Sequence, residues 1–188
     1  MPAHAQHLDP GRVYRTAHLA CWSANPTRLA RSLEAEGVLQ KLSHGLFHAP
    51  AQSRFGTVPP SDEALLHAFF DGTPYVVTGP PRWNALGLGG TQLFAHPLVY
   101  NTKRTGQVAI GGRTFLLRRV AFPVDPPAEW FVVDLLRNAE AVGLTREALE
   151  RSVKRALTEG RFDAAVLAEM AGRFGRKAEQ AVVRRATS

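Results

Sequence analysis

Residues 25–47 restrict the fold of this chain more than any other stretch, because each part of it favours one kind of local structure. Asn25 is expected to cap a helix, since its side-chain oxygen can accept an unpaired backbone N–H, and Pro26 suits the first helical position. Two leucines that lie four residues apart share the buried face of this segment. Gly37 is expected to stop it. The pattern therefore predicts a short helix that begins at Pro26.

A β-hairpin is expected to follow this helix directly. Val38, Leu39 and Leu42 favour a strand, residues 43–45 (Ser-His-Gly) favour a tight turn, and Leu46 begins the return strand. A short helix with a basic, small-polar outer face, followed at once by a hairpin, is how a winged helix-turn-helix presents itself to DNA. We therefore predict an N-terminal winged helix-turn-helix domain.

The segment before the helix is expected to complete this domain. Residues 3–8 favour a short first helix that stops at residues 9–11 (Asp-Pro-Gly). Val13 and Tyr14 favour a strand that pairs with the hairpin, and residues 16–21 favour a helix that positions the next one.

The distribution of charge indicates where an anionic partner would bind. The 188 residues carry a net charge of +7, and the pI is about 10.3. Residues 1–56 hold six basic and three acidic side chains, residues 57–172 hold twelve of each, and residues 173–188 hold five and one. The excess lies in the predicted DNA-reading domain and in the tail, although a merely basic protein would have the same pI.

The side chains expected to contact double-stranded DNA follow from this arrangement. Those on the helix would reach base edges or phosphates in a major groove, those near its N-terminus would contact the backbone, and those of the hairpin would touch phosphate or the minor groove. Two arginines before the helix are placed to contact phosphate, or are simply solvated. The complete set is Arg12, Arg15, Ser23, Asn25, Thr27, Arg28, Arg31, Lys41, Ser43 and His44.

The remainder of the chain predicts a second domain of mixed α/β structure, so the fold class is α+β. Residues 48–60 are rich in Pro, Gly and small residues and are expected to form a linker. We place the winged domain at residues 1–52 and the second domain at residues 58–188, with a small sheet over 74–120 and helices over 129–185. The predicted elements of the second domain are a helix capped by Ser61 and ended by Gly72, strands at 75–78 and 97–102, a short helix at 82–86, a hairpin turning at Gly111 and Gly112, and helices at 129–142, after Thr145, at 163–172 and at 173–185.

Catalytic and metal-binding patterns are not evident, so we expect neither an enzyme nor a cofactor. The sequence lacks GxSxG, HExxH and CxxC motifs. His18 and Cys21 could hold zinc, but two ligands do not make a site, and the histidines that flank the hairpin turn lack further ligands. A single cysteine, with no signal peptide and no bilayer-spanning run, predicts a cytoplasmic protein without membrane association.

The sequence is also compatible with two other functional classes. A glycine-rich loop at residues 86–91 suggests a nucleotide-binding or enzyme-accessory protein, although it matches neither GxGxxG after a strand nor GxxxxGKS/T. A protein-interaction module, in which the N-terminal domain binds another protein, would share the same architecture.

Several stretches resemble one known family. Residues 12–50 read RVYRTAHLACWSANPTRLARSLEAEGVLQKLSHGLFHAP, with a small-residue run before the helix and a Gly-Leu-Phe-x-x-Pro end to the hairpin. Residues 59–70 (PPSDEALLHAFF), 75–92 (YVVTGPPRWNALGLGGTQ) and 100–103 (YNTK) follow. Over roughly residues 10–122, the chain resembles the AbiEi family of type IV antitoxins.

The resemblance implies a repressor that controls its own operon. In that family the winged domain binds repeats in its own promoter, and the C-terminal region supplies antitoxin activity. The paired toxin resembles a nucleotidyltransferase, and neutralisation need not involve direct contact. A stand-alone winged-helix regulator would have the same N-terminal domain.

Overall fold

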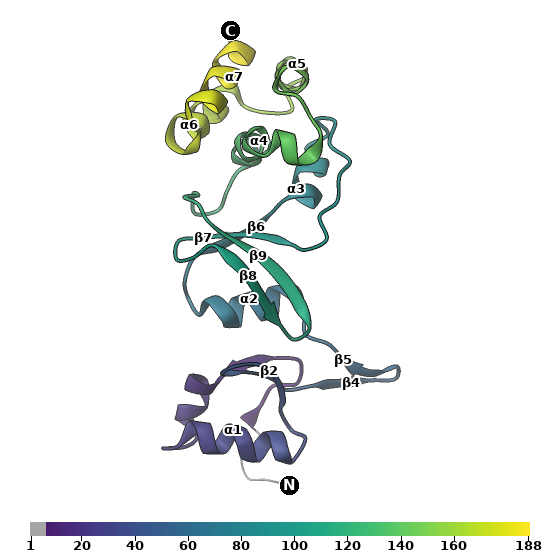
Figure 1. Ribbon diagram of the computed structural model, residues 1–188, viewed down its shortest axis with the longest axis vertical. Helices are drawn as coiled ribbons and strands as arrows, with labels where there is room; N and C mark the ends of the chain where they lie inside the picture. The colour runs from purple at the N-terminus through teal and green to yellow at the C-terminus, as the bar shows by residue number, and fades with distance from the viewer. Residues whose placement is uncertain (1–6) are drawn as a thin grey trace. The chain divides into compact units, whose positions relative to one another are not determined.

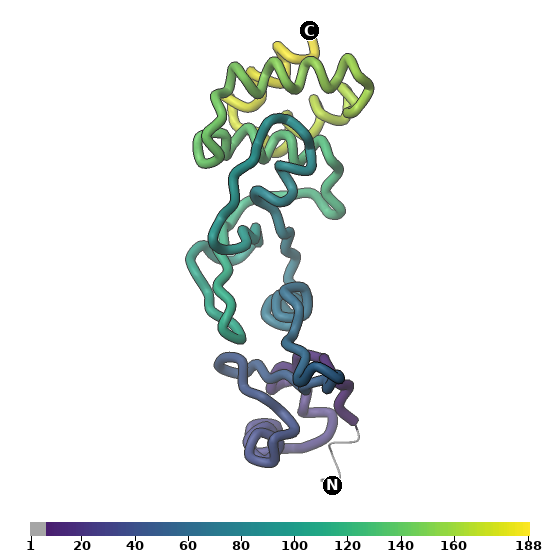
Figure 2. Tube along the Cα trace, turned by 90° about the vertical axis from the view of Figure 1, so that its right-hand side faces the viewer, coloured from purple at the N-terminus to yellow at the C-terminus, as the bar shows by residue number. Residues whose placement is uncertain are grey.

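The computed structural model describes residues 7–188, and the fold is mixed α+β (Figure 1). The helix predicted at residues 3–8 falls mainly on positions outside the described residues. The chain forms two compact units: the first comprises Met1–Thr73 with Val108–Thr114, and the second comprises Pro74–Gln107 with Phe115–Ser188. The course of the chain within each unit can be followed in Figure 2.

The first unit begins with a three-stranded antiparallel sheet and two helical segments. The sheet has the order β1-β3-β2, and Tyr14 on its first strand lies opposite Phe47 on the central one. The predicted strand, helix and hairpin are thereby confirmed. The elements are β1 (Val13–Arg15), the 3-10 helix η2 (Thr16–Cys21), α1 (Pro26–Ala35), β2 (Gln40–Ser43) and β3 (Leu46–His48).

Helix α1 starts and packs as its sequence predicts. Asn25 Oδ1 accepts a hydrogen bond of 3.0 Å from the backbone N–H of Arg28, which satisfies one of the unpaired N–H groups of the first turn. Ala30 and Leu33 are buried in a small core. Gly37 follows the helix with φ +73°, a conformation that L side chains rarely adopt. One face of α1 is thus fixed inward, and the opposite face is left to solvent.

The segment predicted as a linker contains a β-hairpin instead. Strands β4 (Ala51–Ser53) and β5 (Gly56–Val58) pair antiparallel, and Gln52 Nε2 donates a 3.1 Å hydrogen bond to Thr57 Oγ1. The Pro- and Gly-rich composition was therefore a sign of turns rather than of an unstructured connection.

Helix α2 (Asp62–Phe70) belongs to the first compact unit, whereas the sequence placed it in the second domain. Ser61 caps it as predicted, and the helix ends at Asp71, which has φ +48°. Arg113 Nε lies 2.7 Å from Asp62 Oδ1, so the tip of a later hairpin is held to the start of this helix. These long-range contacts have no signature in local composition, which explains the different boundary.

The chain also contains a four-stranded mixed sheet in the order β6-β7-β9-β8 (Figure 1). Strands β6 and β7 belong to the second unit, whereas the β8–β9 hairpin is divided, because its residues Val108–Thr114 belong to the first unit. Strands β6 and β7 pair antiparallel, whereas β7 and β9 pair parallel, with Leu98 opposite Leu116. The strands and the short helix after the first of them are β6 (Tyr75–Thr78), α3 (Pro80–Ala85), β7 (Leu98–Asn101), β8 (Gly106–Ile110) and β9 (Arg113–Arg119).

Helices make up the remainder of the second unit, and α4 supplies the largest share of the core. Trp130, Val133 and Leu135 on α4 are almost completely buried. The predicted helix over 129–142 is divided, because α4 ends and a 3-10 turn begins at Asn138. The helices are α4 (Ala128–Arg137), η3 (Ala139–Val142), α5 (Arg146–Thr158), α6 (Ala164–Phe174) and α7 (Lys177–Thr187).

A buried carboxylate organises the interior of this unit. Asp134 is 1% exposed, and its Oδ2 accepts hydrogen bonds from Thr78 Oγ1 (2.5 Å) and Trp83 Nε1 (2.9 Å). Asn138 Nδ2 donates to Asp134 Oδ1 and to the hydroxyl of Tyr100. Burial raises the pKa of Asp134, and burial also raises the pKa of Tyr100. Sequence reasoning missed this cluster.

Across residues 7–188, every helix is too short or too polar to cross a lipid bilayer.

Candidate nucleic-acid interface

The outer face of α1 carries the side chains expected to read DNA. Thr27, Arg28 and Arg31 are exposed, while Ala30 and Leu33 on the other side of the helix are buried. This segregation follows from helical periodicity, because residues on opposite sides of the cylinder cannot share one environment.

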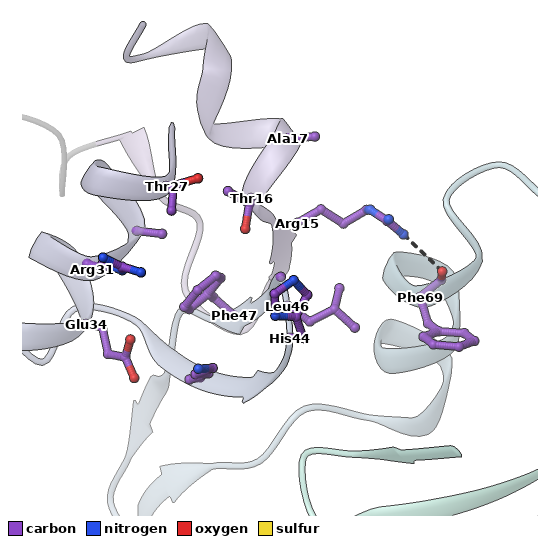
Figure 3. A pocket seen from close by; sticks show the side chains of 13 residues that line it. Arg15, Thr16, Ala17, Thr27, Arg31, Glu34, His44, Leu46, Phe47 and Phe69 are labelled. Carbon is purple, nitrogen blue, oxygen red and sulfur yellow. Dashed lines mark hydrogen bonds between the residues drawn. The ribbon is translucent and has the colours of Figure 1, made fainter. Parts of the chain in front are cut away.

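An open hollow of about 580 Å³ in the first unit brings five of the ten predicted side chains together (Figure 3). Its walls come from α1, from the β2–β3 hairpin and its turn, from the β1–η2 junction and from the end of α2. The predicted residues that line it are Arg15, Thr27, Arg31, Lys41 and His44. Segments that are separate in sequence therefore form one concave surface.

The charge of the hollow is predominantly positive. Arg15, Arg31 and Lys41 contribute cations, and Glu34 is the acidic side chain in the lining. Within residues 7–188, Arg31 and Lys41 form no ion pair, so their charges stay available to a ligand. A surface of this kind attracts anionic groups, and phosphates in particular.

The two arginines nearest the N-terminus have partners inside the protein. Arg15 points toward α2, where its Nη1 donates hydrogen bonds to the backbone oxygens of Ala68 (3.2 Å) and Phe69 (3.0 Å) (Figure 3). Arg12 Nη1 lies 3.0 Å from Asp9 Oδ2. Both side chains thus act within the fold, which the sequence did not indicate.

Three of the smaller predicted residues also serve local structure. Ser23 Oγ accepts a 3.1 Å hydrogen bond from the N–H of Asn25, whose own oxygen caps α1. Ser43 is half-buried at the end of β2, opposite Leu46. Ser23, Asn25 and Ser43, together with Arg12 and Arg28, lie outside the lining of the hollow.

Sequence reasoning missed the other eight residues that line the hollow, namely Thr16, Ala17, Ala30, Glu34, Gly45, Leu46, Phe47 and Phe69. Glu34 had a readable signal, because it follows Arg31 by three residues and Thr27 by seven, which places all three on one helical face. Phe47 reaches the hollow through the pairing of β1 with β3, and the backbone N–H of Thr16 donates a hydrogen bond to the oxygen of Gly45 in the hairpin turn.

The described residues contain no group of three metal-ligating side chains. His18 Nε2 lies 3.2 Å from Asp71 Oδ1, and Cys21 donates its thiol hydrogen to the backbone oxygen of His18. His48 is completely buried in β3, and neither ring nitrogen has a hydrogen-bond partner among the described residues. Burial lowers the pKa of His48, while the backbone of Gly11 opposes this shift.

Comparison of the sequence with protein-family models gave no match, and comparison with curated proteins gave no significant match.

Proposed function

We propose that the first unit is a winged helix-turn-helix that binds double-stranded DNA and that the protein is a transcriptional repressor. The observation that carries this proposal is the hollow in which Thr27 and Arg31 of α1 stand beside Lys41 and His44 of the β2–β3 hairpin. A helix and an adjoining hairpin are the two elements that a winged helix offers to a duplex. The free cations on both elements support an anionic polymer as the ligand.

In this proposal α1 enters the major groove, which is wide enough to admit a helix. Arg28 and Arg31 carry planar guanidinium groups that can donate two hydrogen bonds to one guanine, and Thr27 can donate to a base edge or a phosphate. Lys41 and His44 lie on the hairpin and would contact the sugar–phosphate backbone. Arg15 is not assigned a DNA contact in this proposal, because its guanidinium donates hydrogen bonds to backbone oxygens of α2 and so stabilises the fold.

A binding assay with duplexes from the region upstream of the gene tests this proposal. Arg28→Ala and Arg31→Ala are each expected to weaken binding at least about tenfold, since one bidentate contact to guanine contributes roughly 1–3 kcal/mol. Arg12→Ala is the matched control, because it removes an exposed arginine of the same unit that is already paired with Asp9. Equal binding by all three variants and the wild type would refute the placement of α1 in the groove.

We further propose that the repressor is the antitoxin of a type IV toxin–antitoxin system and represses its own operon. The support is the resemblance of residues 10–122 to the AbiEi family. Co-expression with a neighbouring nucleotidyltransferase-like gene tests it. Cells that express that gene alone should grow poorly, and co-expression of the wild-type protein should restore their growth. DNA binding by the wild-type protein without rescue of growth would instead indicate a stand-alone regulator.

A further inference from the structure

The β2–β3 hairpin, which we call the wing, contains an irregularity in its first strand. Lys41 on β2 lies opposite Phe47 on β3, and Ser43 lies opposite Leu46, so Leu42 is an extra residue with no partner on β3. An extra residue of this kind is a β-bulge, which bends a strand and redirects the side chains beside it. The direction of the Lys41 side chain therefore depends on the conformation of the bulge.

A turn from a distant part of the chain is bonded to this bulge. The backbone N–H of Gly111, in the turn between β8 and β9, donates a 3.1 Å hydrogen bond to the backbone oxygen of Leu42. Both residues belong to the first compact unit, which includes residues 108–114. The extra residue of the wing thus has a hydrogen-bond partner outside its own sheet.

The contact leaves little room for a side chain at residue 111. A Cβ atom on Gly111 would lie 3.0 Å from Leu42 Cδ2 and 3.5 Å from Leu65 Cδ2. The next residue, Gly112, shares the left-handed backbone conformation, with φ +77° against +58°, but a Cβ atom there would meet no atom within 4 Å. A side chain at 111 would therefore press on the bulge, whereas one at 112 would not.

An ion pair anchors the same turn to α2. Arg113 Nε lies 2.7 Å from Asp62 Oδ1, and Arg113 Nη2 donates a 3.1 Å hydrogen bond to Asp62 Oδ2, at the start of the helix. A guanidinium that engages both oxygens of a carboxylate is fixed in orientation as well as in position. The turn is consequently held where Gly111 meets the bulge.

We propose that the β8–β9 turn is a positioning device for the wing, in which Gly111 holds the bulge at Leu42 in the conformation that presents Lys41 to a DNA phosphate. This inference rests on the proposed function and adds to it that a much later segment of the chain controls the affinity. The turn itself is assigned no contact with DNA. Its effect passes through Lys41, whose ammonium group forms no ion pair within residues 7–188.

The experiment replaces each glycine of the turn with asparagine in the full chain and measures binding to the upstream duplex over a range of KCl concentrations. Asparagine tolerates positive φ and is favoured in two-residue hairpin turns, so the β8–β9 hairpin itself should persist in both variants. Gly111→Asn should weaken binding roughly eightfold at about 0.1 M KCl and lower the slope of log K against log[KCl] by about 0.9, which corresponds to one lost phosphate contact. Gly112→Asn is the matched control and should change neither quantity.

Combination with Lys41→Ala distinguishes positioning from a general loss of stability. Lys41→Ala alone should give the same loss of affinity and of slope as Gly111→Asn. The double variant should bind no more weakly than either single variant, because both substitutions remove the same contact. Additive losses, or wild-type binding by either single variant, would overturn the inference.

The ion pair gives a second test, in which electrostatics and positioning predict opposite signs. Asp62→Ala removes a negative charge and leaves Arg113 without its partner, and both changes by themselves should raise the affinity for a polyanion. Because the substitution also releases the turn, we expect a net loss of affinity. Glu63→Ala removes the same charge from the same turn of α2, where Glu63 forms no ion pair within residues 7–188, and should not weaken binding. An equal rise in affinity for both variants would contradict positioning.

Hydrogen exchange of the free protein separates failure of this inference from failure of the proposed function. The backbone amides of residues 40–45 should exchange faster in Gly111→Asn than in Gly112→Asn, since the bulge has lost its partner. Faster exchange in Gly111→Asn, with no DNA binding by the wild type, would refute the proposed function although the turn supports the wing. Unchanged exchange and affinity in Gly111→Asn, with loss of binding in Arg31→Ala, would overturn the positioning device and leave the proposed function standing.

Discussion

Arg15 of β1 donates a 3.0 Å hydrogen bond from Nη1 to the backbone oxygen of Phe69, in the last turn of α2. The same guanidinium nitrogen reaches the oxygen of Ala68, and Nε lies 3.4 Å from Asp71 Oδ2. A cation at the C-terminal end of a helix satisfies carbonyl groups that have no partner inside the helix and interacts favourably with the helix dipole. Arg15 therefore fastens α2 to the sheet of the first unit.

Replacing Arg15 with alanine should destabilise the first unit by about 2 kcal/mol, because carbonyl groups at the end of α2 lose a charged donor. Lysine should restore only part of the loss, since one ammonium group cannot reproduce the planar guanidinium fork. Urea unfolding followed by circular dichroism measures the effect. Arg12→Ala, which breaks an exposed pair with Asp9, should cost less than about 1 kcal/mol. Equal losses for the two alanine variants would contradict the role given to Arg15.

Replacing Asn25 with alanine should cost about 1 kcal/mol of stability, because the N–H of Arg28 loses its cap. Serine at this position should retain most of the stability, since its hydroxyl can accept the same hydrogen bond. Thermal unfolding compares the two variants. An alanine variant as stable as the wild type would show that the cap contributes nothing.

His48 should make the first unit less stable in mild acid. Its pKa is lowered in the folded protein, so the unfolded chain binds more protons over the range below its ordinary value of 6.5. The stability is fully present above pH 6.5 and is lost as the pH falls toward the folded pKa. Replacement by leucine removes this titration, and the difference in unfolding free energy between the wild type and His48→Leu should change between pH 7.5 and pH 5. A constant difference across that range would exclude the effect.

Replacing Asp134 with alanine should destabilise the second unit by about 3 kcal/mol or more. The hydroxyl of Thr78 and the indole N–H of Trp83 would become buried donors without an acceptor. Asparagine should be less harmful, because its side-chain oxygen can accept both hydrogen bonds. Thr78→Val removes one donor and leaves the carboxylate with Trp83, so we expect an intermediate loss. Chemical denaturation of the three variants would contradict this order if alanine were the best tolerated.

The sequence by itself determined most of the local structure. The cap at Asn25, the turn before Leu46 and the helix after Ser61 depend on residues that are close together in the chain, so the sequence pattern was sufficient to predict them. The exposure of Thr27, Arg28 and Arg31 also followed from helical periodicity, because the buried positions fix which face remains outside.

Only the tertiary structure decided which residues meet. Arg15 had the signature of a surface cation, yet its partners lie on a helix more than fifty positions later, at Ala68 and Phe69. The acceptor shared by Thr78 and Trp83 is equally remote, at Asp134. A buried polar group requires a partner, but its sequence neighbours do not specify which one, because that choice depends on how strands pair and helices pack. The chain's local periodicity thus set its elements and their exposed faces, and long-range packing set its compact units, its hollow and its buried network.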